Sequence, residues 1–211
     1  MQEWQERAKV LEYLARKDSL PYRQDGEATL LDLIPPSAQC ILDLGTGDGR
    51  LLGLVKARYP HVAGLALDFS PPMLEAVRQN FAGDPSVTII EHDLGQPLPP
   101  LDAAHPLDAI VSSFVIHHLP HDRKRALYAE IFDRLAPGGV FCNLEHVASP
   151  SPRLHDRFLQ RIGRTRETED RSNKLLDMET QLRWLREIGF QDVDCYWKWL
   201  EYGLLAGVKP A

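Results

Sequence analysis

The spacing of three aspartates constrains the fold of this chain more than any other feature of its sequence. Asp43, Asp68 and Asp93 each close an apolar, strand-like run, and successive members of the set are 25 residues apart. That interval fits one strand followed by one helix. Because parallel strands joined by helices present their carboxyl ends at one edge of a sheet, we expect the three carboxylates to lie together there, where open α/β sheets bind their ligands.

The rest of the chain continues this alternation of strands and helices. Apolar runs predict five strands, at 40–44, 62–69, 87–93, 107–115 and 140–147. Helical periodicity predicts helices at 4–17, 30–34, 50–58, 70–81, 121–136 and 178–190. The last stretch, 193–209, predicts two tightly joined antiparallel strands at the end of the sheet. The pattern as a whole predicts a doubly wound α/β fold, with a mostly parallel sheet and helices on both faces.

Length and charge narrow the class of protein. The 211 residues suffice for one domain, and we expect a single domain over 1–211, with a helical cap at 1–33 and a lid inserted at 148–176. A net charge of −6 argues against a broad nucleic-acid surface, which needs clustered Lys and Arg. No apolar run reaches the length of a membrane span, and the N-terminus lacks a signal peptide's apolar centre. We therefore expect a cytoplasmic protein, and we expect its three widely spaced cysteines to be buried thiols.

The first strand-end aspartate precedes a glycine loop, GTGDG, which lets the backbone approach a ligand closely. A triphosphate-binding loop needs Lys and then Ser or Thr after its last glycine, whereas Gly49 is followed by Arg50. A dinucleotide-binding loop has the spacing GxGxxG, whereas this loop is GxGxG and has Arg50 in the third glycine position. These differences oppose an NAD-dependent oxidoreductase, which stays an alternative. Asp43 and Asp48 beside the loop suit a cationic ligand better than a pyrophosphate.

Five successive motifs resemble those of class I S-adenosylmethionine-dependent methyltransferases. In chain order they are ILDLGTGDGRLL, ALDFSPPMLEAV, EHDLGQPLP, DAIVSSFVIHHLP and LAPGGVFCNLEHV. The closing VDCYWKWLEYGLLAGVK is similar to the final antiparallel hairpin of that family. The resemblance covers roughly 34–209. It implies a seven-stranded sheet in the order 3-2-1-4-5-7-6 with strand 7 antiparallel, S-adenosylmethionine as cofactor, and methyl transfer as the activity.

The resemblance also implies which residues bind the cofactor along the ligand edge of the sheet. They are Asp43, Gly45, Thr46, Gly47 and Gly49 around the methionine part, Asp68 at the ribose, Phe69 and Met73 beside the adenine, Asp93 and Leu94 at the adenine edge, and Ser112 at the amino-acid end. The chemistry of these residues agrees, since a sulfonium and an ammonium suit an acidic site. Arg23 is a further candidate, as a partner of the cofactor's carboxylate, and an exposed surface arginine is the alternative.

Three residues are candidates for acid–base chemistry. Methyl transfer mainly requires alignment of the acceptor, and it needs a base only when the acceptor arrives protonated. His117 and His118 follow the fourth strand, and imidazole is a base near neutral pH. Glu145 closes the fifth strand. Each has a structural alternative, because a histidine can cap or pack on the next helix and Glu145 can bond the backbone of the lid. The sequence shows no metal-ligand pattern, so we expect no metal.

The basic excess of the predicted lid could admit an anionic substrate or tRNA. Residues 148–176 contain seven basic and four acidic residues, which indicates a solvated segment of mixed charge. Their one aromatic residue, Phe158, is too few for a base-stacking surface. We therefore expect a small-molecule acceptor, and a monomer or a homodimer. A tRNA- or RNA-modifying enzyme and a non-catalytic cofactor-binding partner subunit are the alternatives. Trp197 and Trp199 alternate along one strand, so we expect them to share a face and cover the core, and lining of an apolar acceptor pocket is the alternative.

Overall fold

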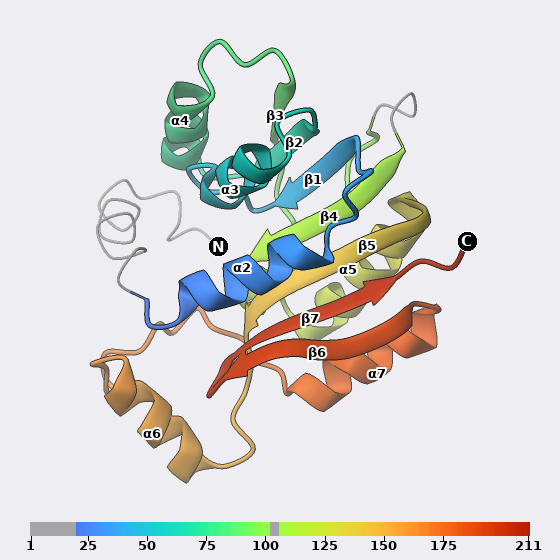
Figure 1. Ribbon diagram of the computed structural model, residues 1–211. Coiled ribbons are helices and arrows are strands. Elements are labelled where there is room, and N and C mark those ends of the chain that lie inside the picture. The colour runs from blue at the N-terminus through green and yellow to red at the C-terminus, as the bar shows by residue number, and fades with distance from the viewer. Residues whose placement is uncertain (1–19, 102–105) are drawn as a thin grey trace.

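A seven-stranded sheet with helices on both faces forms the centre of the molecule (Figure 1). The computed structural model describes residues 20–101 and 106–211. The strands are β1 (Cys40–Leu44), β2 (Ala63–Asp68), β3 (Val87–Glu91), β4 (Leu107–Ser113), β5 (Leu135–His146), β6 (Gln191–Trp199) and β7 (Tyr202–Val208). Their order is β3-β2-β1-β4-β5-β7-β6, and β7 runs antiparallel to both of its neighbours while the other pairs are parallel. The predicted fold class, strand order and antiparallel last strand are confirmed.

Helices cover both faces of the sheet. They are α2 (Arg23–Leu33), α3 (Arg50–Arg58), α4 (Pro71–Asn80), α5 (His121–Arg134), α6 (Pro152–Arg161) and α7 (Met178–Ile188), with a short 3-10 turn, η3 (Ile116–His118). Side chains of α2 and α3 pack with one face of the central strands, and side chains of α5 and α7 pack with the other. The predicted helix at 4–17 lies outside the described residues.

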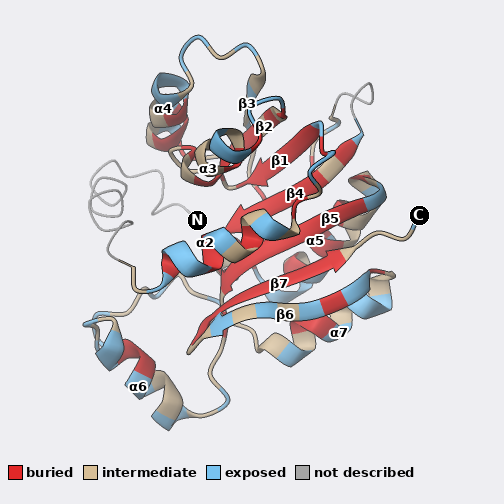
Figure 2. Cartoon of the chain, viewed as in Figure 1, coloured by how far each residue is buried: buried red, intermediate tan, exposed pale blue. Residues whose placement is uncertain are grey.

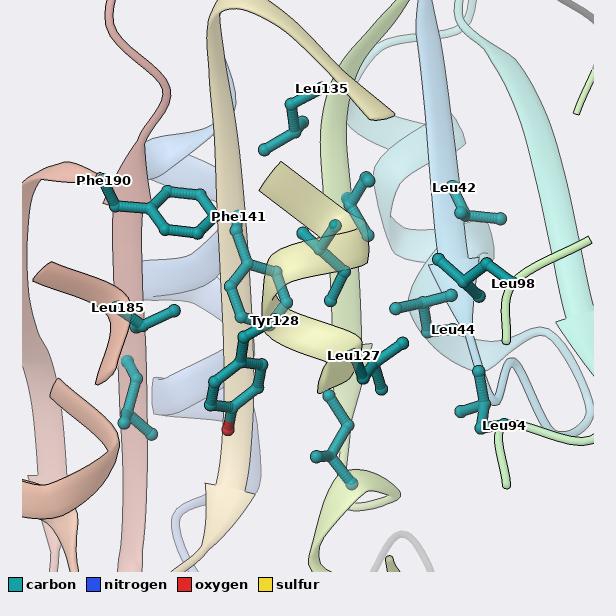
Figure 3. Close-up of a cluster of buried hydrophobic side chains, with 14 of the residues drawn as sticks. Leu42, Leu44, Leu94, Leu98, Leu127, Tyr128, Leu135, Phe141, Leu185 and Phe190 are labelled. Carbon is teal, nitrogen blue, oxygen red and sulfur yellow. The ribbon is translucent and has the colours of Figure 1, made fainter. Parts of the chain in front are cut away.

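The central strands are buried on both faces, as a doubly wound sheet requires. Every residue of β1 is buried, whereas β6 at the edge of the sheet is partly exposed (Figure 2). Along β1, Leu42 and Leu44 point into the larger core cluster, and Ile41 points into the cluster on the opposite face. Figure 3 shows part of the larger cluster, which contains these two leucines together with Leu127 of α5. Burial of each such side chain stabilises the fold by roughly 1.5–3 kcal/mol.

Two helix boundaries differ from those predicted. The short helix expected at 30–34 belongs to α2, which begins at Arg23 and buries Arg23, Gly26 and Glu27 on one face of its first turns. Helix α5 ends at Arg134, and the following PGG belongs to β5. Gly138 there has a φ of +79° and donates its N–H to the Lys209 carbonyl, so the motif continues the sheet where a helix end was expected.

Residues 148–176, the predicted lid, follow β5 and contain α6. The helix begins after Ser151, whose side chain accepts from the Leu154 N–H. Phe158 and Leu159 are its buried residues, and they pack in a cluster with Tyr202 at the start of β7. Figure 1 shows α6 beyond the end of the sheet, beside the turn between β6 and β7.

Two other predictions, on the cysteines and the tryptophans, are tested by the described residues. Cys40, Cys142 and Cys195, all within the described part, are free. The first two are buried as predicted, whereas the prediction is wrong for Cys195, which is only partly buried because it lies on the edge strand β6. Trp197 is partly buried and packs against the core, close to Gly26 of α2, and Trp199 contacts Tyr202. Within 20–101 and 106–211, no helix is long and apolar enough to cross a membrane.

Candidate functional site

A cavity lies at the carboxyl ends of β1, β2 and β4, the edge that the strand-end aspartates predicted. Most of the predicted cofactor residues line it: Arg23, Asp43, Gly45, Thr46, Gly47, Asp68, Phe69, Met73 and Leu94. Strand β1 lies between β2 and β4, and both pair with it in parallel. The loops that follow the three strands therefore meet over one edge, which brings together residues that are far apart in the sequence.

The three glycines of the loop have different roles. All have positive φ, at +65° for Gly45, +59° for Gly47 and +85° for Gly49. A Cβ on Gly45 would lie 2.4 Å from a methyl of Val115, and one on Gly49 would lie 2.5 Å from the Phe81 ring. On Gly47, a Cβ would meet only the Met73 sulfur, at 3.8 Å, among the described residues. Gly47 therefore leaves room in the cavity, whereas Gly49 lies outside the cavity wall and permits close packing at the start of α3.

Asp43 and Asp68 present buried carboxylates to the cavity. The Asp43 carboxylate accepts from the Thr46 hydroxyl at 2.7 Å, and Asp68 accepts from the backbone N–H groups of Gly47 and Ser70 at 2.9 and 2.8 Å. Burial raises the pKa of Asp43 to about 7, and it also raises the pKa of Asp68. A cation or a hydroxyl donor in the cavity would therefore stabilise both ionised carboxylates.

A buried ion-pair cluster borders the cavity beside α2. Arg23 is 4% exposed, and its Nε lies 2.7 Å from Glu27 Oε1. Arg50 donates to both oxygens of the same Glu27 at 2.9 Å. Arg23 also donates to the Ser113 hydroxyl at 3.3 Å and lies over the Phe114 ring. Sequence reasoning missed Glu27, which joins α2 to the start of α3 and explains why an arginine can follow the glycine loop.

Two predicted cofactor residues on strand ends lie outside the cavity wall. The Asp93 carboxylate accepts from the Gly95 N–H at 2.7 Å, and its neighbour His92 lines the cavity in its place. The Ser112 hydroxyl is fully buried and donates to the Leu44 carbonyl at 3.0 Å, whereas Ser113 lines the cavity. In both cases the sequence located the strand end, and the side chain that faces the cavity is an adjacent one.

The three acid–base candidates form two layers. His118 lines the cavity, and its ring lies 4.0 Å from the ring of His117 behind it. The His117 Nδ1 lies 2.5 Å from Oε1 of Glu145, and both of these residues are buried away from the cavity wall. Burial lowers the pKa of both histidines and raises the pKa of Glu145 to about 7. At neutral pH His118 therefore presents an uncharged imidazole to the cavity.

A second polar network, which the sequence analysis missed, anchors α6. Glu201, in the turn between β6 and β7, is 1% exposed. Its carboxylate contacts His146 Nε2 at 2.9 Å, His155 Nδ1 at 2.8 Å and the Ser149 hydroxyl. The other nitrogen of His155 lies 2.9 Å from Glu169. Within the described ranges, no group of three or more His, Cys, Asp or Glu side chains is placed to hold a metal ion.

Comparisons with known proteins agree with this architecture. A family model described as a methyltransferase domain matches residues 41–139. The chain is 31% identical over 202 residues to demethylmenaquinone methyltransferase of Clavibacter sepedonicus, covering 87% of this chain and 79% of that relative. It is 35% identical over 136 residues to trans-aconitate 2-methyltransferase of Methylobacterium nodulans, covering 62% and 48%. A solved O-methyltransferase family protein from Burkholderia thailandensis superimposes with a TM-score of 0.71 at 19% identity, covering 89% and 56%.

The sheet order, the glycine loop and these similarities together define a class. The chain belongs to the class I S-adenosylmethionine-dependent methyltransferases. It spans most of the first relative, but only about half of the second relative and of the solved structure.

Proposed function

We propose that this methyltransferase binds S-adenosylmethionine in the cavity and transfers its methyl group to a small-molecule acceptor. The observation that carries the proposal is the pair of buried carboxylates, Asp43 and Asp68, which line the same cavity as the open position at Gly47. Their raised pKa values fit a ligand that brings positive charge and hydroxyl donors into the cavity. The relatives named above support a small-molecule acceptor, since both are named for small organic molecules.

The cavity has a complementary group for each part of the cofactor. Asp43 would face the cationic methionine end, and Arg23 would hold its carboxylate. Asp68 would accept from the ribose hydroxyls, as an acidic residue after the second strand does in related dinucleotide sites. Phe69 and Met73 supply apolar surface for the adenine. Nε2 of His92 is buried without a hydrogen-bond partner among the described residues, so it is free to pair with a polar atom at the edge of the adenine.

His118 is the residue that we assign to proton transfer. When bound, the cofactor supplies a methyl group on a sulfonium, which is already activated for displacement. The uncharged imidazole of His118 would accept the proton of an acceptor hydroxyl or amine. Phe114, Val115 and Leu119 line the cavity near it and would exclude water from the acceptor.

The proposal is tested with S-adenosylmethionine labelled in the methyl group. Purified protein is incubated with panels of phenols, quinols and carboxylic acids, and separately with tRNA. We expect label in a small molecule. Label in tRNA would replace the proposal with the RNA-modifying alternative. Binding of S-adenosylhomocysteine without turnover on any acceptor would favour the non-catalytic partner subunit.

The role of His118 is tested on the acceptor that this assay identifies. His118→Gln is expected to lower kcat about 100-fold at unchanged affinity for S-adenosylhomocysteine, because general base catalysis typically contributes that factor. His121→Gln, at an exposed position at the start of α5, is the matched control. An unchanged kcat in His118→Gln would remove His118 from the proposed chemistry.

A further inference from the structure

The segment 170–174 holds the two histidines of η3 from outside the sheet. The Ser172 hydroxyl lies 2.9 Å from Nδ1 of His118. Lys174 donates its backbone N–H to the His117 carbonyl at 2.8 Å and its Nζ to the His118 carbonyl at 3.1 Å. Buried Lys124 of α5 in turn donates to the Lys174 carbonyl. Contacts of Lys174 therefore hold the backbone of this segment against η3, and they keep Ser172 in place without involving its side chain.

The Ser172 hydroxyl has a second partner, and this partner decides where its proton lies. Its Oγ lies 2.7 Å from Oδ1 of Asp170, and the Ser172 backbone N–H donates to the same oxygen at 2.9 Å. A hydroxyl has one proton to donate, and a carboxylate oxygen only accepts. The hydroxyl proton therefore goes to Asp170, and Oγ presents a lone pair to His118. For the 2.9 Å contact to be a hydrogen bond, Nδ1 of His118 must carry a proton.

We propose that Ser172 and Asp170 are positioning residues that hold His118 in the Nδ1–H tautomer, so that Nε2 carries the lone pair of the neutral ring. An uncharged imidazole has one protonated and one unprotonated nitrogen, and the hydrogen-bond partners of the ring determine which nitrogen carries the proton. Burial keeps the pKa of His118 well below its ordinary value, so the ring is neutral at the pH of the assay.

This inference rests on the proposed function for its catalytic meaning. In the proposed reaction, His118 is the base that takes a proton from the acceptor. A neutral imidazole takes a proton only at its unprotonated nitrogen, so the tautomer determines which nitrogen performs that step. Ser172 and Asp170 would act through His118 and would not touch the acceptor. They come from the segment 148–176, which follows β5, so this segment contributes to the site by orienting a ring that belongs to another part of the chain.

The test is a measurement of the histidine ring nitrogens by NMR. Protein labelled with ¹⁵N is recorded with long-range ¹H–¹⁵N correlation, which separates protonated from unprotonated ring nitrogens, and His118→Gln assigns the signals. Wild-type protein is compared with Ser172→Ala, with Ser172→Thr, which keeps a hydroxyl, and with Ser149→Ala. Ser149 is the matched control, because its hydroxyl contacts Glu201 in the other network.

The expected spectrum shows a protonated Nδ1 and an unprotonated Nε2 for His118 in the wild type. Ser172→Ala should shift both signals toward the values of a tautomer mixture, Ser172→Thr should restore the wild-type pattern, and Ser149→Ala should leave it unchanged. An unprotonated Nδ1 in the wild type would overturn the proposal, even if a variant fails to fold, and so would unchanged signals in folded Ser172→Ala. The same samples are then titrated with S-adenosylhomocysteine, which separates the tautomer proposal from the proposed function. If the wild-type protein does not bind this compound, the proposed function is contradicted, whereas the tautomer result from the free protein stands.

Discussion

At the scale of single residues, the three strand-end aspartates look equivalent in the sequence and differ in the structure. Asp68 lines the cavity, whereas Asp93 accepts from the Gly95 N–H outside it. We predict that Asp68→Ala weakens S-adenosylhomocysteine binding by about 10- to 100-fold, because a hydrogen bond to a charged group contributes about 1.5–3 kcal/mol. Asp93→Ala should leave the affinity nearly unchanged. Calorimetric titration of both variants checks this, and equal losses would mean that the ribose site is assigned to the wrong strand.

A second prediction concerns the buried charge of Asp43. Its pKa in the folded protein is about 7, above its ordinary value of 3.8, so the folded state is stabilised when this group takes up a proton. Stability that depends on Asp43 is therefore lowest above pH 7 and rises as the pH falls from about 7 toward 4. Asp43→Asn should raise the free energy of unfolding at pH 8 by on the order of 4 kcal/mol, since the pKa goes from 3.8 to about 7 and each pKa unit corresponds to about 1.4 kcal/mol. The gain should shrink at pH 5.

Urea unfolding of the wild type and of Asp43→Asn at both pH values checks this prediction. Taking the difference between the two proteins removes the contributions of other buried acids. A variant that is less stable than the wild type at pH 8 would show that the Asp43 charge is compensated in the free protein. In either case, we expect Asp43→Asn to lose affinity for S-adenosylmethionine, because the uncharged amide no longer attracts the cationic end of the cofactor.

The sequence could predict a site residue where its position relative to the end of its strand was clear. The positions of Asp43 and Asp68 followed from strand spacing, because both lie directly on the edge of the sheet. The choice between Ser112 and Ser113 did not, because adjacent strand residues face opposite sides and the side facing the cavity depends on the exact end of β4. Glu27 was missed because its partner Arg50 is 23 residues away, and only packing of α2 on α3 brings them together.

At the scale of elements, the start of α3 depends on Gly49. Gly49 and Gly83 have the same φ of +85°, but only Gly49 is crowded, since a Cβ added there would lie 2.5 Å from the Phe81 ring. We predict that Gly49→Ala costs about 2–4 kcal/mol, combining the strain of a positive φ with overpacking. Gly83→Ala has open space among the described neighbours and should cost about 1 kcal/mol. Chemical denaturation of the two variants checks the difference, and equal costs would contradict the packing role of Gly49.

The attachment of α6 depends on the charge of His155. Its ring lies between the carboxylates of Glu201 and Glu169, and hydrogen bonds and charge from Glu201 raise its pKa against the opposing effect of burial. A raised pKa means that the stabilisation is fully present below the ordinary histidine pKa, about 6.5, and is lost as the pH rises through the higher folded value. His155→Gln should therefore lower the melting temperature by a few degrees at pH 5.5 and by less at pH 8.5.

Thermal unfolding at the two pH values tests this, with His121→Gln as a control at an exposed position. An equal loss at both pH values would mean that the ring acts through packing rather than charge. The sequence could not predict this network, since it joins α6, the end of β5 and the turn before β7. The start of α2 was also mispredicted, because its first turns resemble polar surface in the sequence although Arg23 and Glu27 in them are buried.

At the scale of the whole molecule, the topology was the most predictable property. Alternating strands and helices required a parallel sheet, and the resemblance supplied the strand order that the structure confirms. Long-range polar contacts were the least predictable, because they depend on how distant segments meet after the sheet has formed. The ligand edge therefore followed from the sequence, while the ion pairs and hydrogen bonds that tune it did not.

The central claim is that the cavity over β1, β2 and β4 is a site for S-adenosylmethionine. Calorimetric titration with S-adenosylhomocysteine, beside NADH as a control, tests it most directly. We predict saturable binding of S-adenosylhomocysteine to one site per chain and no binding of NADH. Binding of NADH alone would contradict the assignment of the glycine loop, and binding of neither compound would contradict the claim that this cavity is a functional cofactor site.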